Sequence, residues 1–414
     1  MKNQNRNIPK IRFKSFEKRW ESYRLSEYSN YRRGSFPQPY GNKEWYGGDN
    51  AMPFVQVVDV LENLRLVADT KQKISTLAQP MSVFVPSDSV IVTLQGSIGR
   101  VAITQYDAYV DRTILIFEDY ISQTNKEFWA YTIRNKFEIE SQKAPGGTIK
   151  TITKEALSDF KVSIPEYTEQ SAIGSLFRTL DDLLASYKEN LANYQSLKAT
   201  MLSKMFPKAG QTVPEIRLDG FEGEWEELQL SDICQKVTEK NKDNKFNETF
   251  TNSAEFGIIN QREFFEKDIS NEKSLNTYYV VRNNDFVYNP RISNYAPVGP
   301  IKRNKLGRTG VMSPLYFVFR IINSNIDLNF LETFFDTNTW HKFMKLNGDS
   351  GARADRFAIK DSVFLTMPIA FPSLPEQQTI GSYFFNLENL INSHQEKISQ
   401  LETLKKKLLQ DMFI

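Results

Sequence analysis

Apolar residues recur at alternating steps of three and four along two long stretches of the chain, a spacing typical of a coiled-coil seam. The seam residues are Ile173, Leu176, Leu180, Leu183 and Tyr187 in the first stretch and Ile380, Tyr383, Leu387, Leu390 and His394 in the second. Each stretch follows a proline, Pro165 or Pro375, after which a helix is expected to begin. About 38 residues at 1.5 Å each give ~57 Å of helix, more than a globular core needs. The pattern predicts two long spacer helices that pair antiparallel, and the recurrence disfavours two ordinary surface helices.

Outside these stretches, β-branched and aromatic residues form short runs that are typical of strands. The runs lie at 54–58, 83–85, 90–94 and 113–117, and then at 278–281, 285–288 and 315–319. Helical patterns follow at 125–136 and 328–345. The order of elements predicts an α+β module with a mainly antiparallel sheet in each half of the chain.

Two segments of the chain return a little over 200 residues later. Ile8–Tyr28 returns at Val213–Ile233 with nine of twenty-one positions identical, and Ile164–Phe206 returns at Phe371–Phe413 with sixteen of forty-three identical. The segments between these anchors are nearly equal in length but show little similarity. The chain is therefore a tandem duplication in which similar scaffolds carry diverged modules. A protein that reads two different targets with one geometry needs this organisation.

Composition narrows the class of protein. At 414 residues, with 40% hydrophobic and 13% aromatic residues, the chain fits two folded domains. The polar start and the lack of an 18-residue apolar stretch predict a cytoplasmic protein with no membrane contact. The single Cys234 excludes an internal disulfide, and His341 and His394 alone leave no Cys/His set for a metal site. The net charge is only +2, but the segment Val281–Gly310 is locally basic.

Polar loops with arginine, asparagine and glutamine lie between the predicted strands. Arginine, asparagine and glutamine side chains offer bidentate partners for guanine and adenine edges, while lysine and serine commonly meet phosphates. The candidate DNA-binding residues of the first module are Arg32, Arg33, Ser35, Gln38, Tyr40, Gln95, Ser97 and Arg100. Those of the second module are Arg291, Asn294, Tyr295, Lys302, Arg303, Lys305, Arg308, Arg353 and Arg356. Each loop alone fits a solvated surface loop, but five of them on two modules favour DNA binding.

Signals for catalysis are poor. The sequence has no phosphate loop of the GxxxxGK[ST] type, no Pro-Asp dipeptide of nucleases and no glycine cluster for a methyl donor. Asn289-Pro290-Arg291 differs from the Asn-Pro-Pro-aromatic signature of adenine methyltransferases, because Arg291 replaces the second proline. A self-contained nucleic-acid enzyme is therefore disfavoured. A coiled-coil interaction scaffold without direct base readout remains the alternative, although it would leave the diverged polar loops unexplained.

The chain contains several short motifs. They are the Pro-x-Ile-Arg and Phe-Glu-x-x-Trp-Glu entries at Pro9–Glu21 and Pro214–Glu226, the Arg-Gly and Gly-Ser-Ile-Gly loops, and the Glu-Gln-x-x-Ile-Gly openings at Glu169 and Glu376. These motifs resemble those of the specificity subunits of type I restriction-modification systems. The resemblance covers almost the whole chain. One departure is Tyr167-Thr168, which lacks the proline found before the second Glu-Gln.

The resemblance implies two target-recognition domains, each reading one half of a bipartite site in double-stranded DNA, joined by an antiparallel pair of long helices with pseudo-twofold symmetry. It places these domains at 1–163 and 211–370, with spacer helices and linker at 164–210 and 371–414. It also implies a non-catalytic chain that holds no cofactor. Two methylation subunits would use S-adenosylmethionine to methylate adenine N6, and two restriction subunits would use ATP and Mg for cleavage.

Overall fold

The structure is a computed structural model that describes residues 7–143, 157, 160–265, 272–349 and 355–414. The chain divides into two units, both of which are α+β. Unit 1 comprises Met1–Glu189 and Glu396–Ile414, and unit 2 comprises Asn190–Gln395. Each unit therefore takes in part of both long helices. None of the helices within the described ranges is long and apolar enough to cross a membrane.

The central sheet of unit 1 has four antiparallel strands in the order β2–β9–β6–β7. They are β2 (Ser29–Arg33), β9 (Ile114–Tyr120), β6 (Val90–Thr93) and β7 (Val101–Ile103). Successive residues of β6 face opposite cores, as the pleat of a strand requires. Val90 and Val92 join the core beneath α2 (Lys126–Lys143), while Ile91 joins the core on the other face.

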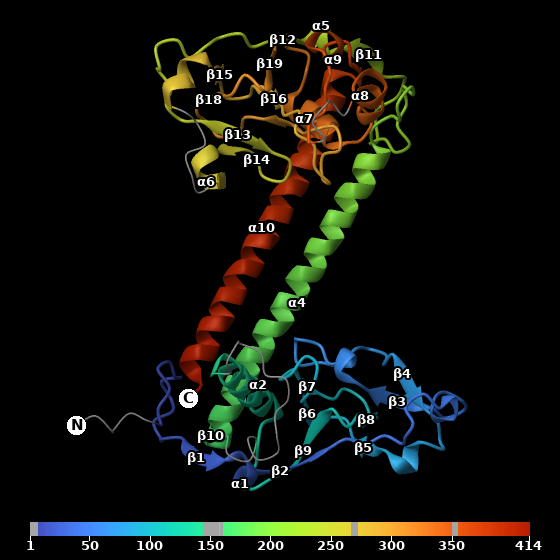
Figure 1. Cartoon of the computed structure of the whole chain (residues 1–414), viewed down its shortest axis with the longest axis vertical. Helices are drawn as coiled ribbons and strands as arrows, with labels where there is room; N and C mark the ends of the chain where they lie inside the picture. The colour runs from blue at the N-terminus through green and yellow to red at the C-terminus, as the bar shows by residue number, and fades with distance from the viewer. Residues whose placement is uncertain (1–6, 144–156, 158–159, 266–271, 350–354) are drawn as a thin grey trace, which may run out of the picture. The chain divides into compact units, whose positions relative to one another are not determined.

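A second sheet of unit 1 lies on the side away from α2 (Figure 1). Its strands, in the order β4–β3–β8–β5, are β4 (Gln72–Ile74), β3 (Met52–Val55), β8 (Ala108–Val110) and β5 (Val83–Val85). Only the β3–β8 pair is parallel. The connections contain the 3-10 helices η1 (Lys43–Trp45), η2 (Val57–Asp59) and η3 (Gln79–Met81). The two sheets together form the module that carries the first set of candidate loops.

The repeated motifs build the scaffold of unit 1. β1 (Glu21–Arg24) pairs with β10 (Lys161–Ile164), and α1 (Leu25–Tyr28) follows β1. β10 leads into α4 (Tyr167–Lys204), at whose start Arg12 donates two hydrogen bonds of 2.6 Å to the buried carboxylate of Glu169. The last turns of α10 (Leu374–Met412) complete this core, because Phe413 stacks on Phe128 with 5.6 Å between ring centroids.

The central sheet of unit 2 repeats the topology, in the order β12–β19–β16–β17. Its strands are β12 (Cys234–Lys236), β19 (Phe317–Ile321), β16 (Phe286–Tyr288) and β17 (Ile301–Arg303). α7 (Leu328–Asp336) packs on β17, as α2 packs on β7 in unit 1, and α8 (His341–Asn347) follows. The two-stranded sheets are β13 (Phe250–Ser253) with β14 (Gly257–Asn260) and β15 (Tyr279–Val281) with β18 (Gly310–Met312). α6 (Gln261–Phe265), η4 (Glu272–Thr277) and α9 (Asp361–Phe364) lie in the connections.

The scaffold of unit 2 repeats that of unit 1 contact by contact. β11 (Glu226–Gln229) pairs with β20 (Pro368–Phe371), and α5 (Leu230–Ile233) follows β11. Arg217 binds Glu376 through hydrogen bonds of 2.8 and 2.7 Å, which is the counterpart of Arg12 with Glu169. Phe206 packs on Phe330 at 5.3 Å, as Phe413 does on Phe128. The duplication predicted from the sequence is therefore confirmed at the level of individual contacts.

The two long helices are confirmed, with 38 residues in α4 and 39 in α10. Within unit 1 their contacts are Asp181 with Lys405 and Lys188 with Glu402, and within unit 2 they are Tyr194 with His394 and Lys198 with Glu388. Within each unit, residues further along α4 contact residues earlier in α10, so the paired segments run antiparallel. His394 packs edge-to-face on the Tyr194 ring, as expected for a seam position.

Three local expectations differ from the structure. Val57 and Val58, expected in a strand, lie in η2, because the Asp59 carboxylate accepts hydrogen bonds from the backbone of Gln56 and Lys71 and closes a tight turn. The helix expected over 328–345 breaks into α7 and α8. α10 begins at Leu374, one residue before Pro375, because proline is tolerated where the first backbone N–H groups have no helical partner.

Candidate nucleic-acid interface

The two units carry a loop at the same place in equivalent sheets. Loop L1 (Leu94–Gly99) joins β6 to β7, and loop L2 (Pro290–Gly299) lies in the connection from β16 to β17. Thr93 N donates to Arg100 O at 2.9 Å in unit 1, and Asn289 N donates to Pro300 O at 2.9 Å in unit 2. The loops therefore leave and rejoin their sheets in the same register, although L2 is longer.

Each loop ends on a glycine with a left-handed backbone. Gly99 has φ +81° and Gly299 has φ +84°. A Cβ on Gly99 would lie 2.9 Å from the Cβ of Phe137, and a Cβ on Gly299 would overlap the carbonyl oxygen of Asn289. Both the φ values and the close packing therefore require glycine. The shared exit geometry shows that L1 and L2 are structural counterparts despite their different sequences.

L1 presents a small polar surface. Gln95 and Ser97 are exposed at its tip. Arg100, just after the loop, is half-buried, and its guanidinium lies 3.4 Å from the carbonyl oxygen of Val60 and 3.7 Å from the carboxylate of Glu62. The two tip residues are thus directed outward, whereas Arg100 is held against the module.

The other candidate segment of unit 1, residues 32–40, lies along the module surface. Arg32 forms an ion pair of 2.6 Å with Glu118, and Ser35 donates to the carbonyl oxygen of Met81 at 3.1 Å. Arg33 and Gln38 are exposed. Phe36 anchors the segment in a cluster of aromatic rings. The segment is therefore a fixed surface with exposed polar side chains.

Unit 1 contains a hollow of about 400 Å³. Tyr40, which the sequence analysis selected, lines it together with Arg112 and Gln56, which the sequence analysis did not select. The Tyr40 hydroxyl donates to the buried carboxylate of Asp111, and the guanidinium of Arg112 lies over the Tyr40 ring at 5.4 Å. Gly96 of L1 lies close to Val57, the residue after Gln56. Arg112 and Gln56 were missed because both lie outside the polar loops, Gln56 directly after β3 and Arg112 in the turn between β8 and β9. An arginine in the short turn between two strands was the only available signal.

L2 projects three of the predicted residues. Arg291, Asn294 and Tyr295 are all exposed, and 83% of Tyr295 is accessible to solvent. A tight turn between Ser293 and Ala296 carries Tyr295, with backbone hydrogen bonds of 3.0 and 3.1 Å. L2 therefore holds an aromatic ring and two polar side chains at the tip of a well-defined turn.

The basic residues after L2 are paired with acids. Arg303 on β17 is buried and contacts Glu332 at 2.9 Å and Asn329 at 2.6 Å. The remaining pairs are Lys302 with Asp336 at 2.6 Å, Lys305 with Glu332 at 2.8 Å and Arg308 with Glu248 at 2.8 Å. Burial lowers the pKa of Lys302, but the carboxylates of Asp336, Glu332 and Glu388 together outweigh it, and the net pKa is raised. Much of the local positive charge is therefore balanced within unit 2, because acids distant in sequence lie beside it.

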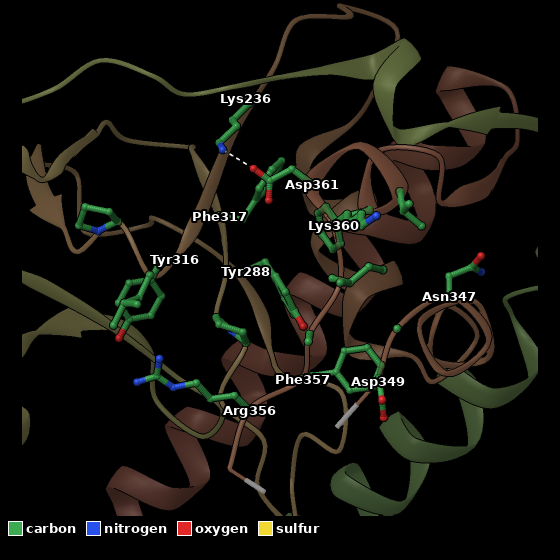
Figure 2. A pocket seen from close by; sticks show the side chains of 18 of the residues that line it. Lys236, Tyr288, Tyr316, Phe317, Asn347, Asp349, Arg356, Phe357, Lys360 and Asp361 are labelled. Atoms are coloured by element: carbon green, nitrogen blue, oxygen red, sulfur yellow. Dashed lines mark hydrogen bonds and ion pairs between the residues drawn. The ribbon is translucent and has the colours of Figure 1, made fainter. Parts of the chain in front are cut away.

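Unit 2 also contains a hollow of about 930 Å³ close to the start of L2 (Figure 2). Pro290 of L2 lines it, together with Arg356 and the aromatic rings of Tyr316 and Phe317. Lys236 and Asp361 form an ion pair at one end. Arg356 thus lies beside L2, while Arg353 lies outside the described residues. Both units place a hollow near corresponding loops, but its chemistry differs between them.

Metal chemistry has no evident place on this surface. The described ranges contain no group of three or more His, Cys, Asp or Glu side chains that could hold a metal ion. Cys234 is buried, and burial raises the pKa of its thiol to about 12. At neutral pH it is therefore protonated and a poor nucleophile.

Comparisons with known proteins give consistent matches. The profile of the family described as type I restriction modification DNA specificity domain matches residues 17–193 and 222–403. The type I restriction enzyme MjaVIII specificity subunit of Methanocaldococcus jannaschii is 20% identical over 401 residues, covering 94% of this chain and 91% of that protein. A crystal structure of a type I restriction-modification S subunit from M. genitalium has the same fold. Its TM-score is 0.60 at 14% identity, covering 98% of this chain and 99% of that one.

Proposed function

This chain belongs to the type I restriction modification DNA specificity family and contains two such domains, and from this premise we propose that each unit reads one half of a bipartite DNA sequence. One observation carries the proposal. Equivalent sheets present equivalent loops, L1 and L2, whose lengths and side chains differ. A duplicated protein that bound the same sequence twice would have no need for that difference. A scaffold without base readout would not need it either.

We assign base contacts to residues of the loops and hollows that are exposed or, for Gln56 and Arg356, half-buried. In unit 1 these are Gln95, Ser97, Gln56 and Arg112, and in unit 2 they are Arg291, Asn294, Tyr295 and Arg356. Arginine can bind guanine and asparagine or glutamine can bind adenine in a bidentate manner, and each such pair discriminates by ~1–3 kcal/mol. Contacts to phosphates position a protein without reading sequence. Arg33 and Gln38, together with the partly exposed Arg32, Lys305 and Arg308, are proposed for that role.

The chain is proposed to supply specificity and no chemistry. Methylation subunits with S-adenosylmethionine and restriction subunits with ATP and Mg would act on the DNA that the chain selects. The family membership and the protonated, buried Cys234 support this assignment. Mass spectrometry of DNA incubated with the purified chain should detect neither methylated nor cleaved product. Activity of the chain free of contaminants would contradict the proposal.

A pair of matched variants tests the assignment of units to half-sites. Arg112→Ala in unit 1 and Arg291→Ala in unit 2 each remove one exposed guanidinium. Sequencing of methylated adenines in cells that express each variant with its methylation subunits should show one relaxed half-site per variant, and a different one in each case. If both variants relaxed the same half-site, the assignment would be wrong. If both only reduced methylation of every site alike, these arginines would be phosphate contacts.

A further inference from the structure

A polar side chain fixes each loop at its base. In unit 1 the Oγ1 atom of the fully buried Thr93 accepts a hydrogen bond from Arg100 N at 3.0 Å and donates to the carbonyl oxygen of Ser97. In unit 2 Asn289 stands in the same register of the sheet. Its Oδ1 atom accepts from Arg291 N at 3.0 Å and its Nδ2 atom donates to the carbonyl oxygen of Asn252 at 2.8 Å.

L2 is longer than L1 and has a second anchor. Asn252 is 2% exposed, and its Nδ2 atom donates to Val287 O at 2.7 Å and to Pro300 O at 3.3 Å. These two carbonyl groups lie on either side of the loop, so one amide ties its entry to its exit. In the shorter L1 a single side chain does this, because Thr93 stands at the entry of the loop and its hydroxyl bonds to Arg100 N at the exit.

Asn252 is retained at an energetic cost. Its Oδ1 atom is buried without a hydrogen-bond partner in the part of unit 2 that the structure describes. An unsatisfied buried acceptor destabilises a protein, because it has lost its hydrogen bonds to water. A leucine of similar size would avoid that cost if the position served packing alone. The amide donor is therefore the feature that the site requires, and its acceptors are the two ends of L2.

We propose that Thr93, Asn289 and Asn252 are positioning residues that fix the two loops before DNA binds and thereby set half-site discrimination without touching a base. This inference rests on the proposed role of L1 and L2. A loop that must be ordered on binding loses conformational entropy at that step and can adapt to a wrong base pair. A fixed loop leaves its donors and acceptors unpaired against a wrong base, which sharpens discrimination.

The test compares substitutions that remove an anchoring group with two kinds of control. One control keeps the anchoring hydroxyl, and the other removes an equally buried amide that does not contact either loop. Thr93→Val removes the hydroxyl, whereas Thr93→Ser retains it. Asn289→Leu and Asn252→Leu each remove one of the two anchors of L2. Asn241→Leu is the control for unit 2, because Asn241 is 2% exposed, as Asn252 is, and also binds backbone groups, at Phe246 and Leu275, away from L2.

The full chain would be expressed with its methylation subunits, and methylation would be measured at sites with one mismatch in either half. For Thr93→Val, the ratio of methylation at mismatched sites to methylation at correct sites should rise roughly tenfold, which is about the effect of losing one bidentate base contact. The rise should occur only for mismatches in the half-site read by unit 1. Asn289→Leu and Asn252→Leu should have the same effect in the unit 2 half-site. Thr93→Ser and Asn241→Leu should leave both ratios unchanged.

Three results would overturn the inference, and they separate it from the proposed function. If Arg291→Ala and Tyr295→Ala relaxed the unit 2 half-site but Asn289→Leu did not, L2 would read DNA without needing its anchor. If none of these variants changed discrimination, L2 would not be a reading element and both proposals would fail. Equal relaxation by Asn289→Leu and Asn241→Leu would also overturn the inference, because loss of stability alone would then explain the effect.

Discussion

The buried ion pair between Arg12 and Glu169 gives a sharp prediction about stability. Glu169 is fully buried, the Arg12 side chain is only 11% exposed, and their hydrogen bonds raise the pKa of Arg12, so the guanidinium stays charged. Glu169→Gln keeps the shape of the side chain but removes its charge. Because this leaves a buried guanidinium without a counter-ion, unit 1 should lose ~3–5 kcal/mol of its free energy of unfolding. That is a large fraction of the ~5–15 kcal/mol that holds a typical domain folded.

The duplication supplies a matched control in Glu376→Gln. Arg217 retains hydrogen bonds to the carbonyl oxygens of Glu222 and Gly223, whereas Arg12 retains one to Lys18. The guanidinium in unit 2 is therefore better satisfied after the substitution, and the loss should be smaller. The double variant Arg12→Met with Glu169→Leu should recover much of the loss, because no unpaired charge remains.

Urea denaturation followed by tryptophan fluorescence measures these effects. Trp20 and Trp129 lie in the core of unit 1, and Trp225 and Trp340 lie in that of unit 2. Trp45 also lies in unit 1. Keeping the tryptophans of one unit and replacing all those of the other with phenylalanine assigns each transition to its unit. A loss below ~1 kcal/mol for Glu169→Gln would refute the reasoning, because that is the value of a solvent-exposed pair.

Three further substitutions have defined outcomes. The hydrogen bond from Arg308 lowers the pKa of Glu248 below its ordinary 4.5, so the pair stabilises unit 2 above that pH and the effect is lost as the pH falls through the lowered value. Glu248→Gln should therefore flatten the dependence of unit 2 stability on pH in acid, as measured by urea titrations at several pH values. Gly299→Ala should lower the melting temperature much more than Gly307→Ala, because both have positive φ but only Gly299 lacks space for a Cβ. Phe413→Ala should destabilise unit 1 by ~3–5 kcal/mol in calorimetry, since it empties a buried aromatic site.

Periodicity and internal repetition predicted the elements whose signals are local. The α4 and α10 helices follow from their apolar seams, and β6, β9, β16 and β19 follow from runs of β-branched and aromatic residues. The antiparallel pairing also followed, because a duplicated chain with two long seams has few other ways to bury them. Such features depend on residues close together in sequence.

Features that depend on distant partners could not be predicted in the same way. L1 and L2 share no evident sequence, and their equivalence emerges only from the backbone bonds at Thr93 and Asn289. The acids that neutralise Lys302 and Arg303 lie on α7, about 30 residues further along the chain. Arg112 lies in the short turn between β8 and β9, where the sequence shows no polar loop pattern. Whether an exposed polar residue meets a base depends on such tertiary placement.

The position of Phe413 in the unit 1 core has a consequence for the order in which the protein is made. Residues up to Glu189 of unit 1 leave the ribosome first, but Phe413 and the last turns of α10 follow only after all of Asn190–Gln395. At ~5–20 residues per second, that interval lasts roughly 10–40 s. During this interval the apolar surface of Phe128 that Phe413 later covers is exposed on the nascent chain. In unit 2 the equivalent core residue is Phe206, which is synthesised before the strands of the unit 2 sheet. Unit 1 therefore begins to be translated first but completes its hydrophobic core last.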